Sequence, residues 1–430
     1  MTVAWFHSLP HGWVSRRIKT ISPVMRGASP RPIDDPIYFD DNGEYAWVRI
    51  SDVTASDGLL TSTTQRLSTL GSSKSVKLDR GKLFLSIAGS VGKPCINDIK
   101  ACIHDGFVYF PYLPLESQKF LYWIFEAREC FSGLGKLGTQ LNLNTETVGN
   151  IAIPFPDLAT QRQIADFLDR ETARIDLLIE KKQRLVEVLE EKRAAKQQST
   201  IDDLLNFFGA SRLKNFTLSI TTGPFGSAIK QDEYVEGGIP ILNPAHIGKG
   251  RITPDASVTL SDEKFRELQY WRLKPGDVLM GRRGDLGRCA VVDDELGDSI
   301  CGTGCLRLRV HPRHNPSYIY LIVSSRRSRE WLDLNAVGTT MKNLNEAIVG
   351  RLPVPAVRRE EQDKFVSDIQ NAHQRNAKVS ANIMASIDRL KEYRSALITA
   401  AVTGQIDVAT YGKAGTTSAT LDRIEEEMSS

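Results

Sequence analysis

Arginine and glycine are concentrated in one short segment whose chemistry suits nucleic acid. Within eight residues lie Gly281, Arg282, Arg283, Gly284, Gly287 and Arg288. Glycine lets a backbone approach a ligand closely, and the arginine guanidinium makes paired hydrogen bonds to guanine and to phosphate. We therefore predict that Arg282, Arg283 and Arg288 contact DNA, with a solvated charged turn as the alternative. A second group, Arg326, Arg327 and Arg329, follows a helical pattern and favours a solvated helix face.

Four residues have a spacing that could hold a metal ion. Cys301, Cys305, His311 and His314 follow one another closely, but the spacer between the Cys pair and the His pair is far shorter than in a zinc finger. The intervening residues alternate in polarity as in a strand. We expect thiols here and no metal site. The chain has 6 cysteines and no C-x-x-C pair, which fits a reducing compartment.

Two further motifs invite a catalytic reading. Phe131, Gly133, Gly135 and Gly138 spell a glycine pattern used to bind S-adenosylmethionine, but that loop requires a preceding strand, and a helical pattern precedes it here. Asn243-Pro-Ala-His246 is similar to the Asn-Pro-Pro-Tyr motif of amino-methyltransferases, yet His246 replaces the aromatic ring that would stack a flipped base. We predict that the chain carries no catalytic residue.

The chain contains an internal repeat. Leu143, Asn144, Val148 and Gly149 recur 201 residues later as Leu344, Asn345, Val349 and Gly350. Upstream, the segment 78–93 aligns with 273–288, so the Gly/Arg segment has a counterpart at 86–93, where only Lys93 keeps a charge. Two related units with different loop chemistry are what readers of two different sequences should show. We add Lys93 and Lys342 to the predicted DNA contacts.

Length and composition are those of a multi-domain globular protein. The chain has 430 residues, of which 41% are hydrophobic and 25% charged, with 55 basic against 52 acidic residues. It contains no apolar run of about 18 residues and no signal-peptide pattern, so we expect no membrane span and a cytoplasmic location. The predicted domains are 1–150 and 209–350 for recognition, 151–208 and 351–409 for helical spacers, and 410–430 for a disordered tail.

The two large units are predicted to be α+β, because short alternating runs are separated by turn signals such as "PGD". One helix is expected in each, at 119–129 and at 317–332. The spacers follow paired prolines and read as helices of about 40 residues, or roughly 60 Å. Spacing of 4 and 3 predicts an apolar seam at Ile164, Leu168, Ile175, Leu178, Leu185, Leu189, Phe365, Ile369, Val379, Ile383, Leu390 and Leu397. We predict an antiparallel intramolecular coiled coil.

These features together resemble the DNA-specificity (S) subunit of type I restriction-modification enzymes. The resemblance is carried by "LPHGW" at Leu9, by the two segments "GKLFLSIAGSVGK" and "GDVLMGRRGDLGR", by the long run from Ile153 to Arg193, and by "ALITAAVTGQIDV" from Ala396. It spans nearly the whole chain. The second copy departs more, since "PAVRREEQDKFVSDI" keeps Glu361 and Gln362 but loses the usual apolar run.

The resemblance implies a noncatalytic subunit that reads a bipartite target in double-stranded DNA with two recognition domains. It further implies two methyltransferase (M) subunits and restriction (R) subunits as partners. S-adenosylmethionine, ATP and magnesium are then expected on those partners, with no cofactor on this chain. Two alternatives stay open from the residues alone: a stand-alone DNA adenine methyltransferase and a structural coiled-coil adaptor.

Overall fold

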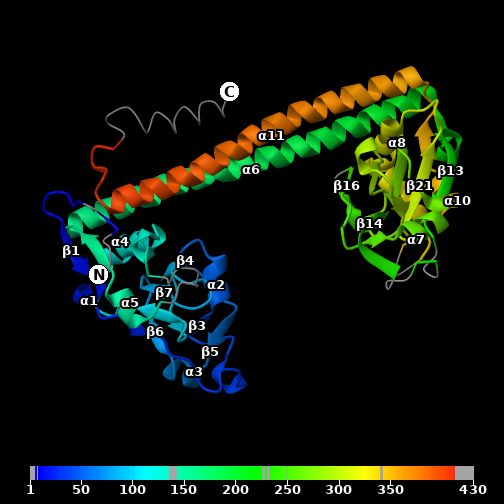
Figure 1. Cartoon of the computed structure of the whole chain (residues 1–430). Coiled ribbons are helices and arrows are strands. Elements are labelled where there is room, and N and C mark those ends of the chain that lie inside the picture. The colour runs from blue at the N-terminus through cyan, green and yellow to red at the C-terminus, as the bar shows by residue number, and fades with distance from the viewer. Residues whose placement is uncertain are drawn as a thin grey trace. The chain divides into compact units, whose positions relative to one another are not determined.

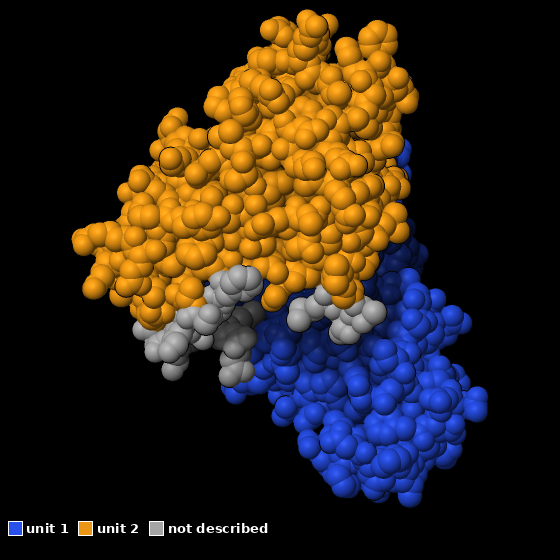
Figure 2. Space-filling view, turned by 90° about the vertical axis from the view of Figure 1, so that its right-hand side faces the viewer, with its two compact units in different colours: residues 1–183, 384–430 blue, residues 184–383 orange. Residues whose placement is uncertain are grey.

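The computed structural model describes residues 5–6, 8–134, 143–224, 228–229, 233–248, 250–338 and 342–411. It divides into two compact units, drawn in blue and orange in Figure 2. Unit 1 comprises Met1–Gln183 with Met384–Ser430, and unit 2 comprises Arg184–Ile383. Each unit contains an α+β body and part of both long helices. The predicted fold class is therefore confirmed.

Unit 1 contains short strands and short helices. Its strands are β1 (Val14–Arg17), β2 (Met25–Arg26), β3 (Tyr45–Val48), β4 (Leu59–Leu60), β5 (Gln65–Leu67), β6 (Val76–Leu78), β7 (Leu83–Ser86), β8 (Pro94–Asn97), β9 (Ala101–Ile103), β10 (Phe107–Tyr109) and β11 (Ala152–Phe155). Its helices before α6 are α1 (Ile18–Ile21), α2 (Ile50–Ala55), α3 (Thr69–Ser73), α4 (Leu115–Glu126) and α5 (Thr145–Gly149), with 3-10 turns η1 (Pro36–Tyr38) and η2 (Glu129–Phe131). The sheets have the strand orders β2-β10-β7-β8-β4, β5-β3-β9-β6 and β1-β11.

Unit 2 repeats this plan. Its strands are β12 (Ala210–Arg212), β13 (Thr217–Thr222), β14 (Tyr234–Leu242), β15 (Ile247–Gly248), β16 (Arg251–Ile252), β17 (Thr259–Leu260), β18 (Asp277–Gly281), β19 (Cys289–Val291), β20 (Ile300–Cys301), β21 (Cys305–Val310) and β22 (Pro353–Pro355). Its short helices are α7 (Asp262–Glu267), α8 (Pro316–Val323), α9 (Arg326–Asn335) and α10 (Glu346–Gly350), with 3-10 turns η3 (Leu213–Phe216), η5 (Pro244–His246), η6 (Gln269–Trp271) and η7 (Asp294–Leu296).

The two bodies share strand topology and backbone geometry. The antiparallel run β10-β7-β8 corresponds to β21-β18-β19, and the parallel pair β3–β9 corresponds to β14–β20. Glycines at matching places adopt the left-handed backbone that favours glycine, with φ of 64° at Gly89 and 76° at Gly284, and of 80° at Gly92 and 88° at Gly287. The repeat seen in the sequence is thus a repeat of fold.

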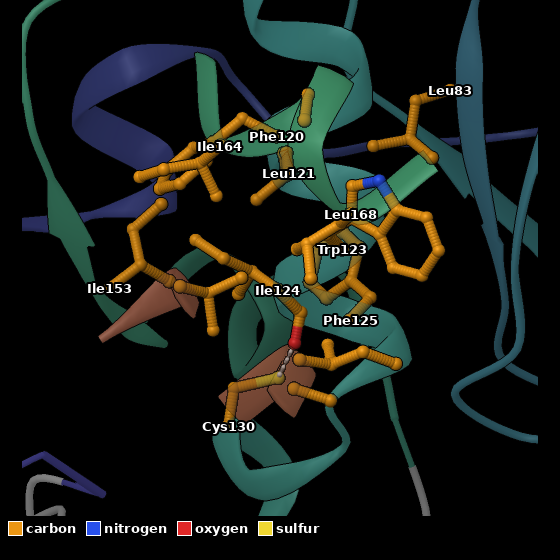
Figure 3. Packing of buried hydrophobic residues seen from close by; sticks show 14 of the residues in the cluster. Leu83, Phe120, Leu121, Trp123, Ile124, Phe125, Cys130, Ile153, Ile164 and Leu168 are labelled. Carbon is orange, nitrogen blue, oxygen red and sulfur yellow. Dashed lines mark hydrogen bonds between the residues drawn. The ribbon is translucent and has the colours of Figure 1, made fainter. Parts of the chain in front are cut away.

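The core of unit 1 joins the sheet to the helices. Helix α4 is apolar on most of its faces, and Phe120, Leu121 and Ile124 are at most 2% exposed. Figure 3 shows these side chains pointing toward Ile164 and Leu168 of the helix that follows β11. Each such buried side chain contributes about 1.5–3 kcal/mol relative to exposure. This packing fixes the body of unit 1 to the start of that helix.

Two long helices follow the paired prolines, α6 (Leu158–Phe208) and α11 (Arg359–Val402). Within each unit they lie side by side and antiparallel (Figure 1). In unit 1, Arg394 of α11 lies 3.0 Å from Asp176 of α6, and in unit 2 the start of α11 packs against the end of α6 in one core. Each helix begins with a buried glutamine, Gln161 or Gln362, whose side chain donates to a carbonyl five residues earlier.

The seam predicted at 3.5-residue spacing drifts along both helices. Eight of its positions are buried: Ile164, Leu168, Ile175, Leu178, Phe365, Ile369, Leu390 and Leu397. Leu189 and Ile383 are half-buried. Leu185 and Val379 are wrongly placed, at 43% and 46% exposed, and the half-buried positions are Val186 and Ser380 instead. A straight helix has 3.6 residues per turn and drifts by about 20° per heptad, which accounts for this one-residue shift.

The single helix predicted at 317–332 is also wrong, because the structure has two. Helix α8 ends at Val323, and α9 begins at Arg326. Ser324 and Ser325 separate them, and the Ser325 hydroxyl accepts a hydrogen bond from the Ser328 N–H at 3.3 Å, as an N-cap does. Most of the predicted tail, 412–430, lies outside the described residues. Within the described ranges, no helix is long and apolar enough to cross a membrane.

Candidate nucleic-acid interface

In both units, one loop between two central strands is held by the same backbone hydrogen bond. In unit 1 the β7–β8 loop is tied to the turn before β10, because the Ile87 N–H donates to the Gly106 carbonyl at 2.8 Å. In unit 2 the β18–β19 loop is tied to the turn before β21, because the Arg282 N–H donates to the Gly304 carbonyl at 3.0 Å. The predicted DNA-contacting segments therefore occupy equivalent places.

The arginines of the unit 2 loop differ in how far they are already engaged. Arg282 is half-buried, its Nε donates to Asn343 Oδ1 at 3.0 Å, and burial lowers the pKa of its guanidinium. Arg288 makes two long contacts of 3.4 Å, with Asp285 and with the Pro244 carbonyl. Arg283 is exposed, and its guanidinium has no hydrogen bond or ion pair within the described residues. Arg283 is thus the member of this loop best placed to bind an outside group.

The two predicted lysines are engaged within the protein. Lys93 Nζ donates to the Thr54 and Ser56 carbonyls, both at 3.0 Å. It therefore caps the end of α2, which favours a structural role, and its assignment as a DNA contact stays a prediction. Lys342 is exposed and forms an ion pair with Asp333 at 2.5 Å. An exposed pair of this kind is weak and can be exchanged for a phosphate at small cost.

Three unit 1 arginines near the equivalent loop were missed by the sequence reasoning. Arg26 Nε donates to the Asp105 carbonyl, and Arg31 lies 3.2 Å from the Asp105 carboxylate, in the turn that holds the loop. Arg49 is exposed beside Ile50, which packs against Gly89 of the loop. These arginines come from separate segments, and only the fold brings them together. No spacing in the sequence signals them.

The motif Asn243-Pro-Ala-His246 forms the 3-10 turn η5 at the end of β14. The Asn243 N–H donates to His246 Nδ1 at 3.2 Å. The equivalent turn in unit 1 has the same construction, with the Arg49 N–H donating to Asp52 Oδ2 at 2.8 Å. The motif therefore caps a turn in unit 2, as Arg49 and Asp52 do in unit 1. Of the glycine motif, Gly133 follows α4 and η2 rather than a strand, and Gly135 to Gly138 lie outside the described residues.

The residues Cys301, Cys305, His311 and His314 do not come together as one metal-binding group. Cys301 and Cys305 are buried, and burial raises the pKa of the Cys301 thiol to about 12. His314 Nδ1 is 2.9 Å from Gln362 Nε2, at the start of α11. Among the residues that the structure describes, no group of three or more His, Cys, Asp or Glu could hold a metal ion. These thiols are therefore poor nucleophiles that fill the core of unit 2.

Comparisons with known proteins agree with this geometry. The family model "Type I restriction modification DNA specificity domain" matches residues 10–187 and 219–389. The specificity subunit of the type I restriction enzyme EcoBI from Escherichia coli is 21% identical over 294 residues, which is 62% of this chain and 61% of that protein. The chain thus matches less than two thirds of the length of this relative.

Two solved structures share the fold. One comes from work on complex assembly and conformational transition of the type I R-M system; it has a TM-score of 0.70 and 18% identity, over 93% of this chain and 100% of that chain. The other is the HsdS subunit of Thermoanaerobacter tengcongensis, with a TM-score of 0.50 and 18% identity, over 93% and 99%. Since the family model covers most of both repeats, the chain belongs to the type I restriction-modification DNA specificity family.

Proposed function

We propose that this chain is the DNA-recognition subunit of a type I restriction-modification complex and that it has no catalytic site of its own. Each α+β body reads one half of a bipartite target, and the paired helices α6 and α11 set the gap between the halves. In this proposal the chain binds double-stranded DNA in the cytoplasm.

The main support for this proposal is the difference between the equivalent loops of the two bodies. The two bodies have the same strand topology and the same loop glycines, yet their equivalent loops present different side chains. Arg282 and Arg283 stand in unit 2 where Ile87 and Ala88 stand in unit 1. Sequence is read by side chains that reach base edges, whereas the frame only positions them. Two copies of one frame with different loops suit a target with two unlike halves.

The partners in this proposal are two methyltransferase subunits and restriction subunits. The methyltransferase subunits supply S-adenosylmethionine chemistry, and the restriction subunits supply ATP and magnesium. The exposed faces of α6 and α11 are the common frame to which identical methyltransferase subunits dock, since the two helices are repeats of one another.

The test is methylome sequencing of the host with and without the gene. We expect one bipartite adenine-methylation motif to disappear on deletion and to return on complementation. An unchanged methylome would overturn the proposal. Cross-linking of labelled S-adenosylmethionine to the isolated chain separates the alternative of a stand-alone methyltransferase, and we expect no label on this chain.

A further inference from the structure

A cavity of about 780 Å³ lies in unit 2 where the β18–β19 loop, α8 and α9 meet the long helices. Its size is in the range of about 300–1,000 Å³ that suits small ligands. Four arginines line it, namely Arg193, Arg288, Arg326 and Arg329, together with two acids, Glu190 and Asp285. The lining thus carries a formal charge of +2, from four positive and two negative side chains.

Of the four arginines in the cavity lining, Arg193 is the one that forms no ion pair with a described residue. It projects from α6, where its charge acts on both Tyr320 and His373. Its guanidinium forms no hydrogen bond or ion pair with any described residue. By contrast, Arg288 and Arg329 share Asp285, at 3.4 Å and 3.2 Å, and Arg326 pairs with Glu330 at 2.8 Å. Arg193 therefore has its full donor capacity available for a ligand.

The counterpart of Arg193 in unit 1 is Arg394, which forms ion pairs with two carboxylates. Arg394 lies 201 residues after Arg193, at the same position of the repeated helix. It lies 3.0 Å from Asp176 and 3.4 Å from Glu126. Two carboxylates thus form ion pairs with the unit 1 arginine, whereas its counterpart in unit 2 forms none with the described residues.

A tyrosine that occurs at the same place in both units identifies the residue of unit 2 that corresponds to Glu126. The hydroxyls of Tyr122 and Tyr320 lie against Gly58 and Gly250, two glycines in the left-handed region. Four residues after these tyrosines come Glu126 in unit 1 and Ser324 in unit 2. Ser324 lines the cavity, so the carboxylate of unit 1 is absent from this wall in unit 2.

A second exchange places an arginine on the same wall. In unit 1 the ring of Phe131 covers Gly92, and in unit 2 the side chain of Arg329 covers Gly287 at the matching place. The start of α9, a helix of ten residues, also borders the cavity through Ser325 and Arg326, and a helix N-terminus favours anions. At the wall of this cavity, unit 2 therefore has Ser324 in place of Glu126 and Arg329 in place of Phe131.

We propose that this cavity of unit 2 binds a phosphate group, with Arg193 as the central cation and Arg329 and Arg326 beside it. The phosphate comes from the DNA backbone or from a free nucleotide, since both present the same oxygens. Arginine is suited to either because its guanidinium makes paired hydrogen bonds to phosphate oxygens. The DNA source rests on the proposed function, whereas the nucleotide source does not.

The experiment titrates the full-length chain with pyrophosphate and with AMP by calorimetry at low salt. We expect binding by the wild-type chain, and a dissociation constant about tenfold higher or more for Arg193→Ala, the loss expected for a charge-assisted hydrogen bond. Ser324→Glu restores the carboxylate of unit 1 and should weaken binding similarly. Lys192→Ala is the matched control, because Lys192 is exposed on the same helix outside the cavity, and it should stay within about twofold.

Binding that is absent from the wild-type chain, or equal in wild type and Arg193→Ala, would overturn the proposal. A DNA duplex added to the pyrophosphate complex identifies the source. Displacement assigns the phosphate to DNA, and simultaneous binding assigns it to a free nucleotide. A wild-type chain that binds pyrophosphate but no DNA, even when assembled with its partners, would refute the proposed function and leave this site standing.

Discussion

The two units share a frame and differ in how they use charge. In unit 1, apolar side chains of the α+β body pack against the long helices in one core. Beside this core, Arg394 forms ion pairs with two carboxylates. In unit 2, Arg193 forms no ion pair with the described residues, and a largely buried ion pair lies inside the sheet, where Asp277 contacts Arg309 at 2.8 Å. Lys82 occupies the place of Asp277 in unit 1. Backbone geometry is thus retained by glycines and apolar positions, while charged positions are free to diverge.

The largest difference in stability should come from this buried pair. Asp277 is 2% exposed, and its carboxylate accepts from Arg309 and from the Lys274 N–H. Asp277→Ala leaves a partly buried guanidinium unpaired and should cost about 3–5 kcal/mol in the free energy of unfolding of unit 2. Urea unfolding followed by a probe in each unit measures it.

The matched change in unit 1 is Lys82→Ala. Lys82 is half-buried and pairs with no acid among the described residues, so the cost should be below about 1 kcal/mol. Equal losses for the two variants would contradict the idea that only unit 2 depends on a charge inside its sheet.

A smaller effect is expected at the loop that distinguishes the two units. Arg283 is exposed and its guanidinium has no partner among the described residues, so Arg283→Ala should weaken DNA binding of the assembled complex by about 1–3 kcal/mol without loss of assembly. Arg283→Lys keeps the charge but loses the paired hydrogen bonds, and a partial recovery would indicate a phosphate contact. Fluorescence anisotropy with a cognate duplex at fixed salt provides the measurement, and unchanged affinity for the alanine variant refutes the assignment.

The smallest effect on DNA binding is expected at Lys93. Its ammonium binds two carbonyls at the end of α2, so Lys93→Ala should lower the stability of unit 1 by about 0.5–1.5 kcal/mol. DNA affinity should change by less than about 0.5 kcal/mol. A large loss of affinity with normal stability would return Lys93 to the DNA interface.

The repeat and the long helices could be predicted from sequence because both are periodic. The break at Ser325 was missed, because a serine with a helix on each side carries no strong stop signal. Leu185 and Val379 were misplaced because the 3.5-residue template ignores helical drift.

The candidate site was less accessible to sequence reasoning. The Gly/Arg loop is contiguous and could be found, but Arg26, Arg31 and Arg49 lie in separate segments that meet only in the folded unit. Arg193 lies in a helix rich in charged residues, where nothing marks it as different from Lys192. It differs in having no carboxylate partner among the described residues, which is a property of the tertiary structure.

The central claim is that the two units read separate half-sites on a shared frame. Its most direct test replaces residues 1–140 with the equivalent unit of a relative and maps methylation in cells that contain the partner subunits. The seam residues of α6 and α11 lie outside the exchanged segment. We therefore expect one half-site to change while the other half-site and the gap stay as they were. Methylation in which both halves change together, or in which neither changes, would contradict the account.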